Sequence, residues 1–226
     1  MLIIFDVDGT LLGGELHDWT SFNRAIETEL GFVVEPGFFG GLPDVTAESI
    51  VEASLRAVGR VPAEGLTSKV QESYLRNLTK CHAADPSAFP VRPGVALLLD
   101  HLTSTEGFSV ALATGDWRPT ISFKLRCAGL DVSRFPMATA SDAPRRTEII
   151  RLAAAKAGRS MTDAIYVGDG EWDLRACREL GIPFIGTGNK MQRLLDAGAE
   201  HICEDLEVEL FGDLLRQIGG NALLRS

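Results

Sequence analysis

An apolar segment runs directly into two acidic residues near the start of the chain, in the stretch IIFDVDGTLL at residues 3–12. The continuous apolar run at 2–5 predicts a short strand that is buried on both faces of a parallel sheet. Burying a carboxylate such as that of Asp6 is unfavourable unless a partner compensates for its charge, and a cation would do so. Side chains two positions apart in an extended segment point the same way, so Asp6 and Asp8 are expected to converge beyond the strand. Gly9 allows the sharp turn that follows.

The composition narrows the classes of partner that the protein can have. The chain has 226 residues, of which 45% are hydrophobic, enough for a large core in one domain or in a core with a smaller unit. Its net charge is −9 and it has no basic run, so neither nucleic acid nor an anionic membrane is an expected partner. The four cysteines show no CxxC spacing, and neither a basic leader nor a membrane-length apolar run is present. We therefore predict reduced thiols in a soluble, cytoplasmic protein.

A helical pattern dominates the chain from residue 14 to about residue 90. Asp18 is a candidate N-cap of the first helix, and Gly31 is a stop signal. A proline-rich stretch at 85–94 ends the block. These features predict an all-helical unit inserted after the first strand. The helical segments are expected at 18–31, 43–59 and 62–80.

Helices and strands alternate from Pro93 onward, which is typical of a parallel sheet with helices on both faces. The sequence therefore predicts an α/β protein with a doubly wound, Rossmann-like parallel sheet core and an inserted all-helical cap domain. The core is expected to comprise residues 1–13 and 91–226, and the cap residues 14–90. The further strands are expected within residues 108–116, 134–142, 163–173, 183–188 and 200–206.

Polar motifs follow three of the expected strands: DVDGT at 6–10, ATGD at 113–116 and VGDGEWD at 167–173. An open parallel sheet binds its ligands at the carboxyl ends of the strands, so these motifs are candidates for one shared site. Asp169 and Asp173 are one helical turn apart, and both can face the same side if a helix starts near Gly170.

Four carboxylates are thus expected at one site, from Asp6, Asp8, Asp169 and Asp173, with no histidine or cysteine among them. Hard oxygen ligands of this kind favour magnesium over zinc. Any one of these aspartates alone would be interpreted as a helix cap or a turn residue. The set of four at two strand ends favours a Mg²⁺ site.

Neutral hydrogen-bond donors accompany the carboxylates at the end of another strand. Thr114 offers a hydroxyl group and Gly115 a backbone amide that a ligand can approach closely, at the start of a helix whose dipole favours anions. A phosphate held by magnesium needs such donors for its other oxygens. A Thr-Gly turn is common, so the motif indicates phosphate binding only together with the carboxylates.

The order and spacing of DVDGT, ATGD and GDGEWD resemble the haloacid dehalogenase superfamily, in particular its phosphoglycolate-phosphatase-like branch with an α-helical cap after the first motif. The resemblance covers nearly the whole chain. It implies that Asp6 is the nucleophile that forms an aspartyl-phosphate. It implies that Asp8 is the general acid and base, and that its backbone carbonyl binds Mg²⁺. It also implies that Asp169 completes the metal ligands, that Asp173 supports the metal directly or through water, and that Thr114 holds phosphoryl oxygens.

A basic phosphate-binding residue is expected before the helix that leads to the fourth strand, where the family usually has lysine. The stretch SDAPRRTEII at 141–150 carries arginine instead, and Arg146 stands in the R-x-E context that some members share. The resemblance implies that Arg146 pairs with the phosphate and the nucleophile as a fork. Arg145 is the alternative for this role.

Substrate recognition is expected to involve the cap. The glycine pair in FFGGLPD at 38–44 separates two expected cap helices, and in the family the corresponding loop often reaches the active site. Gly41 and Leu42 are therefore the nearest candidates. His17, in the hinge towards the cap, is a further candidate, although it also fits an ordinary surface position. Arg118, which follows the threonine motif, could line the entrance.

The resemblance implies a magnesium-dependent phosphatase that hydrolyses a small phosphorylated metabolite. True dehalogenases of the superfamily lack an aspartate at the second position, so Asp8 favours phosphoryl transfer over cleavage of a carbon–halogen bond. A phosphomutase of the same superfamily and a non-catalytic phosphate- or metal-binding protein are the alternatives. Neither the substrate nor the oligomeric state follows from the sequence.

Overall fold

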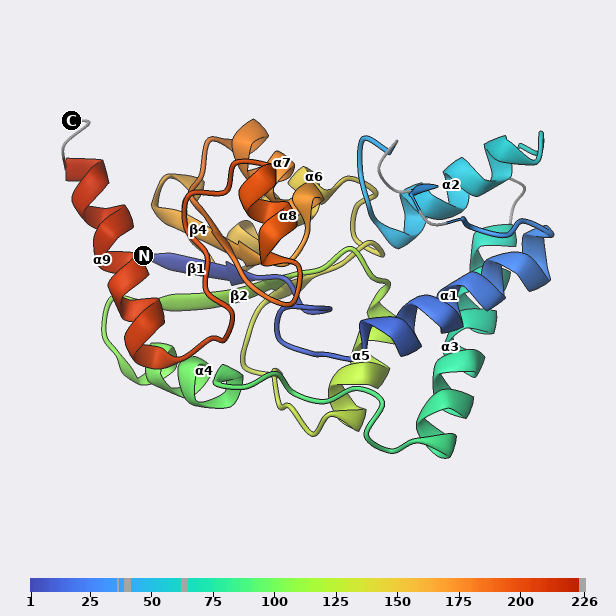
Figure 1. The fold of residues 1–226 in the computed structure, drawn as a ribbon, viewed down its shortest axis with the longest axis horizontal. Helices are drawn as coiled ribbons and strands as arrows, with labels where there is room; N and C mark the ends of the chain where they lie inside the picture. Colours follow the sequence, from blue (N-terminus) through green and yellow to red (C-terminus); the bar gives the residue numbers. More distant parts are fainter. Residues whose placement is uncertain (36, 39–41, 62–64, 224–226) are drawn as a thin grey trace.

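A five-stranded, fully parallel sheet with the strand order β3-β2-β1-β4-β5 lies at the centre of the protein (Figure 1). The computed structural model describes residues 1–35, 37–38, 42–61 and 65–223. The strands are β1 (Leu2–Phe5), β2 (Ser109–Ala113), β3 (Met137–Ala138), β4 (Ala164–Gly168) and β5 (Phe184–Gly186). The predicted parallel sheet is therefore confirmed.

The first strand occupies the middle of this sheet, hydrogen-bonded to β2 on one side and to β4 on the other. All four of its residues are buried, as the apolar run predicts. Ile3 and Phe5 pack on one face of the sheet, whereas Leu2 and Ile4 pack on the other. Because the chain winds outward from β1 in both directions, the strand order reverses beside β1, where open sheets of this kind bind ligands.

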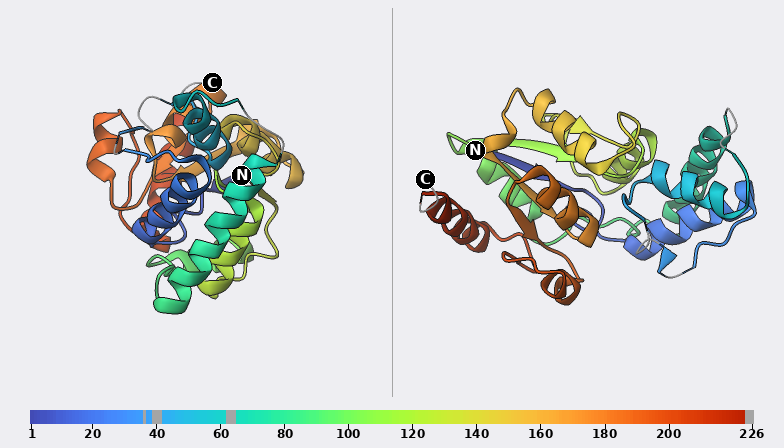
Figure 2. Two further views of the ribbon diagram at one scale, coloured as in Figure 1. Left: turned by 90° about the vertical axis from the view of Figure 1, so that its right-hand side faces the viewer. Right: turned by 90° about the horizontal axis from the view of Figure 1, so that it is seen from above.

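Helices cover both faces of the sheet (Figures 1 and 2). Apolar side chains of α4, α5 and α9 join the core cluster on the face of Ile3 and Phe5, and those of α6, α7 and α8 join the cluster on the other face. A short 3₁₀ turn at Met161–Asp163 leads into β4. The helices are α4 (Val95–Ser104), α5 (Arg118–Cys127), α6 (Arg146–Lys156), α7 (Glu171–Leu180), α8 (Met191–Asp196) and α9 (Val208–Leu223).

Three helices inserted between β1 and α4 form a unit beyond the carboxyl ends of the strands, towards which the strand arrows point (Figures 1 and 2). The helices are α1 (Glu15–Leu30), α2 (Ala47–Ala57) and α3 (Leu66–Ala84). α1 packs along α3, and α3 also contacts α5 of the core. The all-helical insertion is confirmed, and its interpretation as a cap domain with limits at residues 14 and 90 stays a prediction. Within the described ranges, no helix combines the length and apolar character that crossing a bilayer requires.

Local expectations differ from the structure at three places. α1 begins at Glu15, so Asp18 is not its N-cap; the Asp18 carboxylate instead accepts hydrogen bonds from Tyr74 and Lys124. The expected strand at 200–206 is a single bridge between Gly186 and Ile202. The helix α9 was not expected, and its buried side chains cover the sheet beside α4. Gly31 ends α1 with a left-handed conformation (φ 71°), as predicted.

Candidate active site

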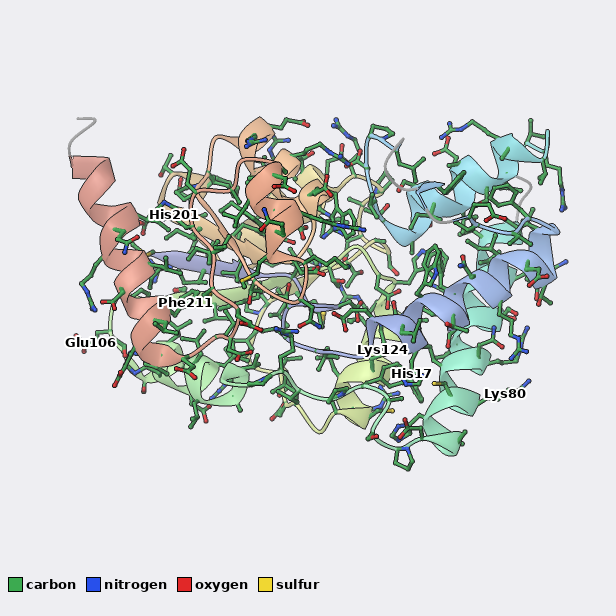
Figure 3. The ribbon with its side chains drawn as sticks, in the orientation of Figure 1. His17, Lys80, Glu106, Lys124, His201 and Phe211 are labelled. Carbon is green, nitrogen blue, oxygen red and sulfur yellow. The ribbon has the colours of Figure 1, made fainter. Side chains whose placement is uncertain are left out.

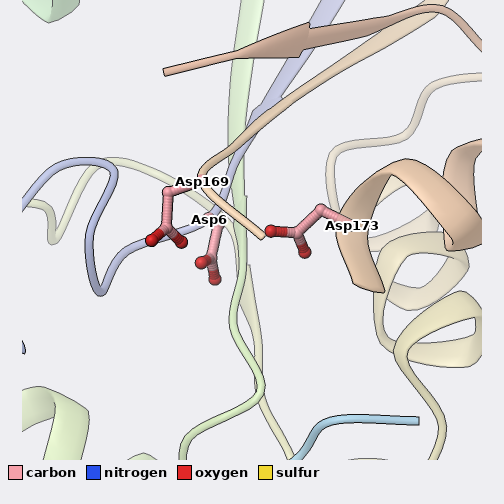
Figure 4. Close-up of side chains that lie close together, drawn as sticks. All are labelled: Asp6, Asp169 and Asp173. Atoms are coloured by element: carbon pink, nitrogen blue, oxygen red, sulfur yellow. The ribbon is translucent and has the colours of Figure 1, made fainter. Parts of the chain in front are cut away.

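Three buried carboxylates meet at the carboxyl ends of the two central strands (Figure 4). Asp6 follows β1, Asp169 follows β4, and Asp173 lies in the first turn of α7. One oxygen of each lies within 4.8 Å of an oxygen of both others. Their residues are only 4%, 5% and 0% exposed, respectively. The expected proximity of these three aspartates is therefore present.

Local backbone features bring the three carboxylates together. Gly9 has a positive φ of 78°, and any Cβ at this position would collide with the carboxylate of Asp169. α7 begins at Glu171, and the carboxylate of Asp173 accepts a hydrogen bond of 3.1 Å from the amide of Gly170. The helix thus starts where the spacing of Asp169 and Asp173 requires it.

The pKa values of all three carboxyl groups in the cluster are raised. Burial, together with repulsion from Asp173, raises the pKa of Asp6 well above its ordinary value. Burial also raises the pKa of Asp173, and it raises that of Asp169 to about 6. The ammonium of Lys190 lies 3.4 Å from Asp169 and offsets only part of this charge.

Arg146 supplies the second positive charge beside the cluster. Its Nη1 lies 2.9 Å from Oδ1 of Asp173 and 3.5 Å from Oδ1 of Asp6, while Nη2 donates to the carbonyl of Val45 at 2.8 Å. Burial disfavours its charge, yet the Asp173 carboxylate raises the pKa of the guanidinium above its ordinary value. Arg145 is exposed and pairs with surface carboxylates. Arg146 is therefore the arginine that reaches Asp6.

Asp8 points to a different place from Asp6, which corrects the expectation that the two carboxylates converge. Its carboxylate groups with those of Asp18 and Asp116, and all three surround the ammonium of Lys124. The chain already turns after Asp6, with the amides of residues 10–12 donating to the Val7 carbonyl, so the alternation of an extended strand no longer applies.

The sequence interpretation missed Lys124, Asp116 and Asp18. Spacing gave one signal, because Asp116, Thr120 and Lys124 recur every fourth residue and share one side of α5 and the turn before it. The Thr120 hydroxyl donates to Asp116 at 2.7 Å, which extends this row of contacts. Asp18 carried no comparable signal, because its role depends on how α1 packs against the core.

The proposed phosphate-binding residues of the second motif lie at the same edge of the sheet. Thr114 is 1% exposed, and its Oγ1 accepts a hydrogen bond from the amide of Asp116. Gly115 has no room for a side chain, because a Cβ there would meet the Arg146 guanidinium and the Val45 carbonyl. Its own carbonyl accepts a 2.7 Å hydrogen bond from the amide of Ala47, which ties the motif to the start of α2.

A cavity of about 540 Å³ opens between the sheet edge and the helical insertion. Its core side carries charged and polar side chains, and α7 and α8 add further charged side chains. Those on the core side are Asp6, Asp8, Thr114, Asp116, Arg146 and Asp169. Its insertion side is mostly apolar, with Trp19 and Phe22 from α1 and Ile50 from α2. The arrangement suits a ligand with an anionic end at the sheet and a less polar end under the insertion.

The candidates for substrate recognition can be compared by whether they line the cavity. Gly41 lies outside the described residues. Leu42 accepts a hydrogen bond from Arg175 through its carbonyl but does not line the cavity, which Val45 and Thr46 of the same segment reach instead. His17 and Arg118 do not line the cavity either, which corrects the expectation for both.

His17 and Arg118 each contact other residues instead of the cavity. The Nδ1 atom of His17 lies 3.4 Å from the Cys81 sulfur, and its Nε2 lies 3.8 Å from the Asp85 carboxylate. Arg118 is held by an ion pair of 2.6 Å with Asp142 and by the Met137 carbonyl. Both side chains are thereby directed away from the cavity.

The cluster of Asp6, Asp169 and Asp173 fits a divalent cation such as Mg²⁺. All its donor atoms are carboxylate oxygens, which are the ligands that this ion prefers. Burial disfavours their charged forms and raises their pKa values, and Arg146 and Lys190 oppose this shift only in part. A cation at this position would stabilise the charged forms.

Comparison with known proteins identified one family. The sequence model of the haloacid dehalogenase-like hydrolases matches residues 1–181. The comparison with curated proteins found no match.

Solved structures with the same fold cover almost the whole chain. A hydrolase from Pseudomonas syringae is 22% identical, with a TM-score of 0.74 over 94% of this chain and 96% of that chain. CbbY from Rhodobacter sphaeroides, solved with phosphate, is 23% identical, with a TM-score of 0.72 over 92% and 95%. A β-phosphoglucomutase from Clostridium difficile is 15% identical, with a TM-score of 0.75 over 96% and 97%. At these identities the likeness establishes the shared fold.

Proposed function

Because the chain belongs to the haloacid dehalogenase-like hydrolases, we propose that it is a magnesium-dependent phosphatase acting on a small phosphorylated metabolite through an aspartyl-phosphate. The observation that carries this proposal is the separation of the first two aspartates into two environments. Asp6 lies among carboxylates and the guanidinium of Arg146, whereas Asp8 lies beside the ammonium of Lys124. Two carboxylates held apart in this way can take two different roles.

Asp6 is the nucleophile in this proposal. Its carboxylate follows the central strand, lines the cavity and lies 3.5 Å from Arg146, which can pair with an incoming phosphoryl group as a fork. Attack by an Asp6 oxygen on phosphorus forms the aspartyl-phosphate and releases the alcohol of the substrate. Thr114, which also lines the cavity, holds the phosphoryl oxygens.

Asp8 acts as the general acid and then as the general base. Burial raises the pKa of its carboxyl group to about 8, so the group carries a proton at neutral pH. It gives this proton to the departing alcohol oxygen. It then accepts a proton from the water that hydrolyses the aspartyl-phosphate. Its place on the cavity wall, beside the insertion, is on the side where a leaving group would lie.

Asp6, Asp169 and the backbone carbonyl of Asp8 would hold the magnesium ion, with Asp173 in support. When bound, the ion neutralises charge on the phosphate that would otherwise repel the nucleophile. Arg146 and Lys190 remain beside the cluster as fixed positive charges.

The test is hydrolysis of p-nitrophenyl phosphate in the presence of Mg²⁺ by the wild-type protein and by Asp6→Asn. We expect phosphate release by the wild type and none by the folded variant, because an amide cannot attack phosphorus. Rapid quenching followed by mass spectrometry should find a phosphoryl adduct on Asp6. Substantial turnover by a folded Asp6→Asn protein would contradict the mechanism.

A phosphomutase is the second candidate, because structural neighbours include β-phosphoglucomutases. The two functions differ in the acceptor of the phosphoryl group, which is water in a phosphatase and a second sugar hydroxyl in a mutase. Incubation with a sugar monophosphate separates them: release of inorganic phosphate supports the phosphatase, and isomerisation without release supports the mutase. A protein that binds phosphate without turnover would be the non-catalytic alternative.

A further inference from the structure

The ammonium group of Lys124 is enclosed by oxygen atoms from four separate segments of the chain. Its Nζ lies 2.8 Å from Asp8 after β1, 2.5 Å from Asp18 on α1 and 3.0 Å from Asp116 after β2. The hydroxyl of Tyr74 on α3 lies 3.3 Å away and itself donates to Asp18. Figure 3 shows Lys124 on α5, at the junction with the insertion. Two of its partners thus come from the core and two from the helical insertion.

The ammonium group of Lys124 is shielded from solvent within this contact set. The side chain of Lys124 is 1% exposed. Burial disfavours its charge, but the three carboxylates raise the pKa of the ammonium well above its ordinary value. The group therefore remains a cation, which donates hydrogen bonds to Asp18 and Tyr74 and forms ion pairs with Asp8 and Asp116. Lysine supplies a compact charge that fits among converging oxygens.

Stability alone does not account for this arrangement. A buried ion pair contributes little net stability over an apolar replacement, because desolvation offsets the attraction. Here three acidic side chains share a single lysine, so one ammonium cannot balance the charge of all three when they are ionised. All three, Asp8, Asp18 and Asp116, also line the cavity. A buried charged cluster at the wall of a cavity is more typical of a functional site than of an arrangement that serves stability alone.

We propose that Lys124 is a positioning residue: it fixes the carboxyl group of Asp8 at the edge of the cavity where the core meets the insertion, and it links that position to α1 and α3 through Asp18 and Tyr74. The inference rests on the proposed function, in which Asp8 serves the leaving group. When the insertion packs against α5, Asp18 and Tyr74 complete the enclosure of Nζ. The acid is then held in one orientation only when the insertion is in place over the cavity.

Proton donation should depend on this orientation more than the other steps do. A substituted phenolate such as p-nitrophenolate departs without help, whereas unsubstituted phenolate needs a proton far more. Loss of orientation at Asp8 should therefore slow phenyl phosphate more than p-nitrophenyl phosphate. Full general acid catalysis is worth about a hundred- to ten-thousand-fold, and misplacement should cost a part of that.

The experiment compares kcat for these two aryl phosphates, which differ by one nitro group, in Lys124→Met, Tyr74→Phe and Asp18→Asn. Lys156→Met is the matched control, because Lys156 also forms a 2.8 Å ion pair with an aspartate but lies on α6, away from Asp8. We expect Lys124→Met to lower kcat for phenyl phosphate at least about tenfold more than for p-nitrophenyl phosphate. Tyr74→Phe and Asp18→Asn should shift the ratio in the same direction by a smaller factor, and Lys156→Met should leave it unchanged.

A crystal structure of Lys124→Met adds a readout that does not require turnover: the Asp8 carboxylate should leave its position beside Asp116. If Lys124→Met does not fold, Tyr74→Phe and Asp18→Asn decide the matter by the same ratio. Equal losses on both substrates in every folded variant, or an unmoved Asp8, would overturn the inference while the proposed function stands. A wild-type protein inactive on both substrates would overturn the proposed function, and the position of Asp8 in the variant would still test the role of Lys124.

Discussion

Nη1 of Arg146 lies 2.9 Å from Oδ1 of Asp173, and this buried ion pair joins the first turns of α6 and α7 beside the nucleophile position. Its two side chains are 6% and 0% exposed. Removing one partner of a buried pair leaves an uncompensated charge, which costs about 3–5 kcal/mol of stability. The pair thus holds the basic group at the site as well as stabilising the fold.

Arg146→Met should therefore both destabilise the protein and abolish most activity towards p-nitrophenyl phosphate. Arg146→Lys should fold better and retain part of the activity, because it keeps the charge but loses the fork. Arg145→Met is the matched control: Arg145 is exposed, and ion pairs of exposed side chains, such as those with Asp44 and Glu179, contribute little to stability. Thermal unfolding and steady-state kinetics provide the measurements. A larger effect of Arg145→Met on kcat/KM would reverse the assignment of the two arginines.

Gly115→Ala should impair activity through a steric effect. A Cβ at this position would meet the guanidinium of Arg146 and the carbonyl of Val45, so one of them must move. We expect the Arg146 side chain to be displaced from Asp6, with a drop in phosphate affinity. Gly219→Ala on α9 is the matched control, because a Cβ there meets nothing within 4 Å. Inhibition by inorganic phosphate gives the affinity, and unchanged inhibition in Gly115→Ala would show that the site tolerates a side chain.

Activity should depend on a small divalent cation. EDTA should remove activity and Mg²⁺ should restore it, because the buried carboxylates of Asp6 and Asp169 need a positive charge between them and the phosphate. Ca²⁺ should restore little, since its larger and looser coordination shell disturbs in-line attack. Titration of EDTA-treated protein with each metal, followed by p-nitrophenyl phosphate hydrolysis, is the measurement. Full activity in metal-free buffer would contradict the metal site.

Much of the fold followed from local sequence patterns. The apolar run at 2–5 becomes the central strand, and the alternation after Pro93 becomes the parallel sheet. These features depend on periodicity and burial, which neighbouring residues determine. The C-terminal helix α9 was not predicted. The strand expected at 200–206 is only one bridge in the structure, which was not predicted either. Both depend on what the rest of the chain leaves uncovered on the sheet.

In the candidate site, too, some features follow from local sequence patterns and others depend on packing between distant segments. Asp6, Asp169 and Asp173 meet because strand ends and helix spacing bring them together, and both can be read from the sequence. The orientation of Asp8 could not be read in this way. It depends on Lys124, which lies 116 residues away along the chain and meets Asp8 only through the packing of α5. Apart from the fourfold spacing of Asp116, Thr120 and Lys124, the sequence gives no sign of the carboxylates that surround this lysine.

The last prediction concerns pH and follows from Asp8. Burial raises the pKa of this carboxyl group from 3.8 to about 8, so the protonated acid predominates below about pH 8 and is lost above it. For phenyl phosphate, kcat/KM should therefore fall about tenfold per pH unit above that point, because the leaving group then lacks its proton. For p-nitrophenyl phosphate the fall should be shallower. On the acid side, burial raises the pKa of Asp169 to about 6, so Mg²⁺ affinity should weaken as the pH falls below about 6.

Profiles of kcat/KM against pH at saturating Mg²⁺ isolate the fall in activity above about pH 8, the alkaline limb. Titrations with Mg²⁺ at each pH isolate the loss of metal affinity below about pH 6. In Asp8→Asn the alkaline limb should disappear for both substrates, because the asparagine side chain does not titrate. An alkaline limb of equal steepness for both substrates, persisting in Asp8→Asn, would assign it to a group other than Asp8. The contrast between the two leaving groups is what connects the limb to proton donation, since a change in metal binding or folding would slow both substrates alike.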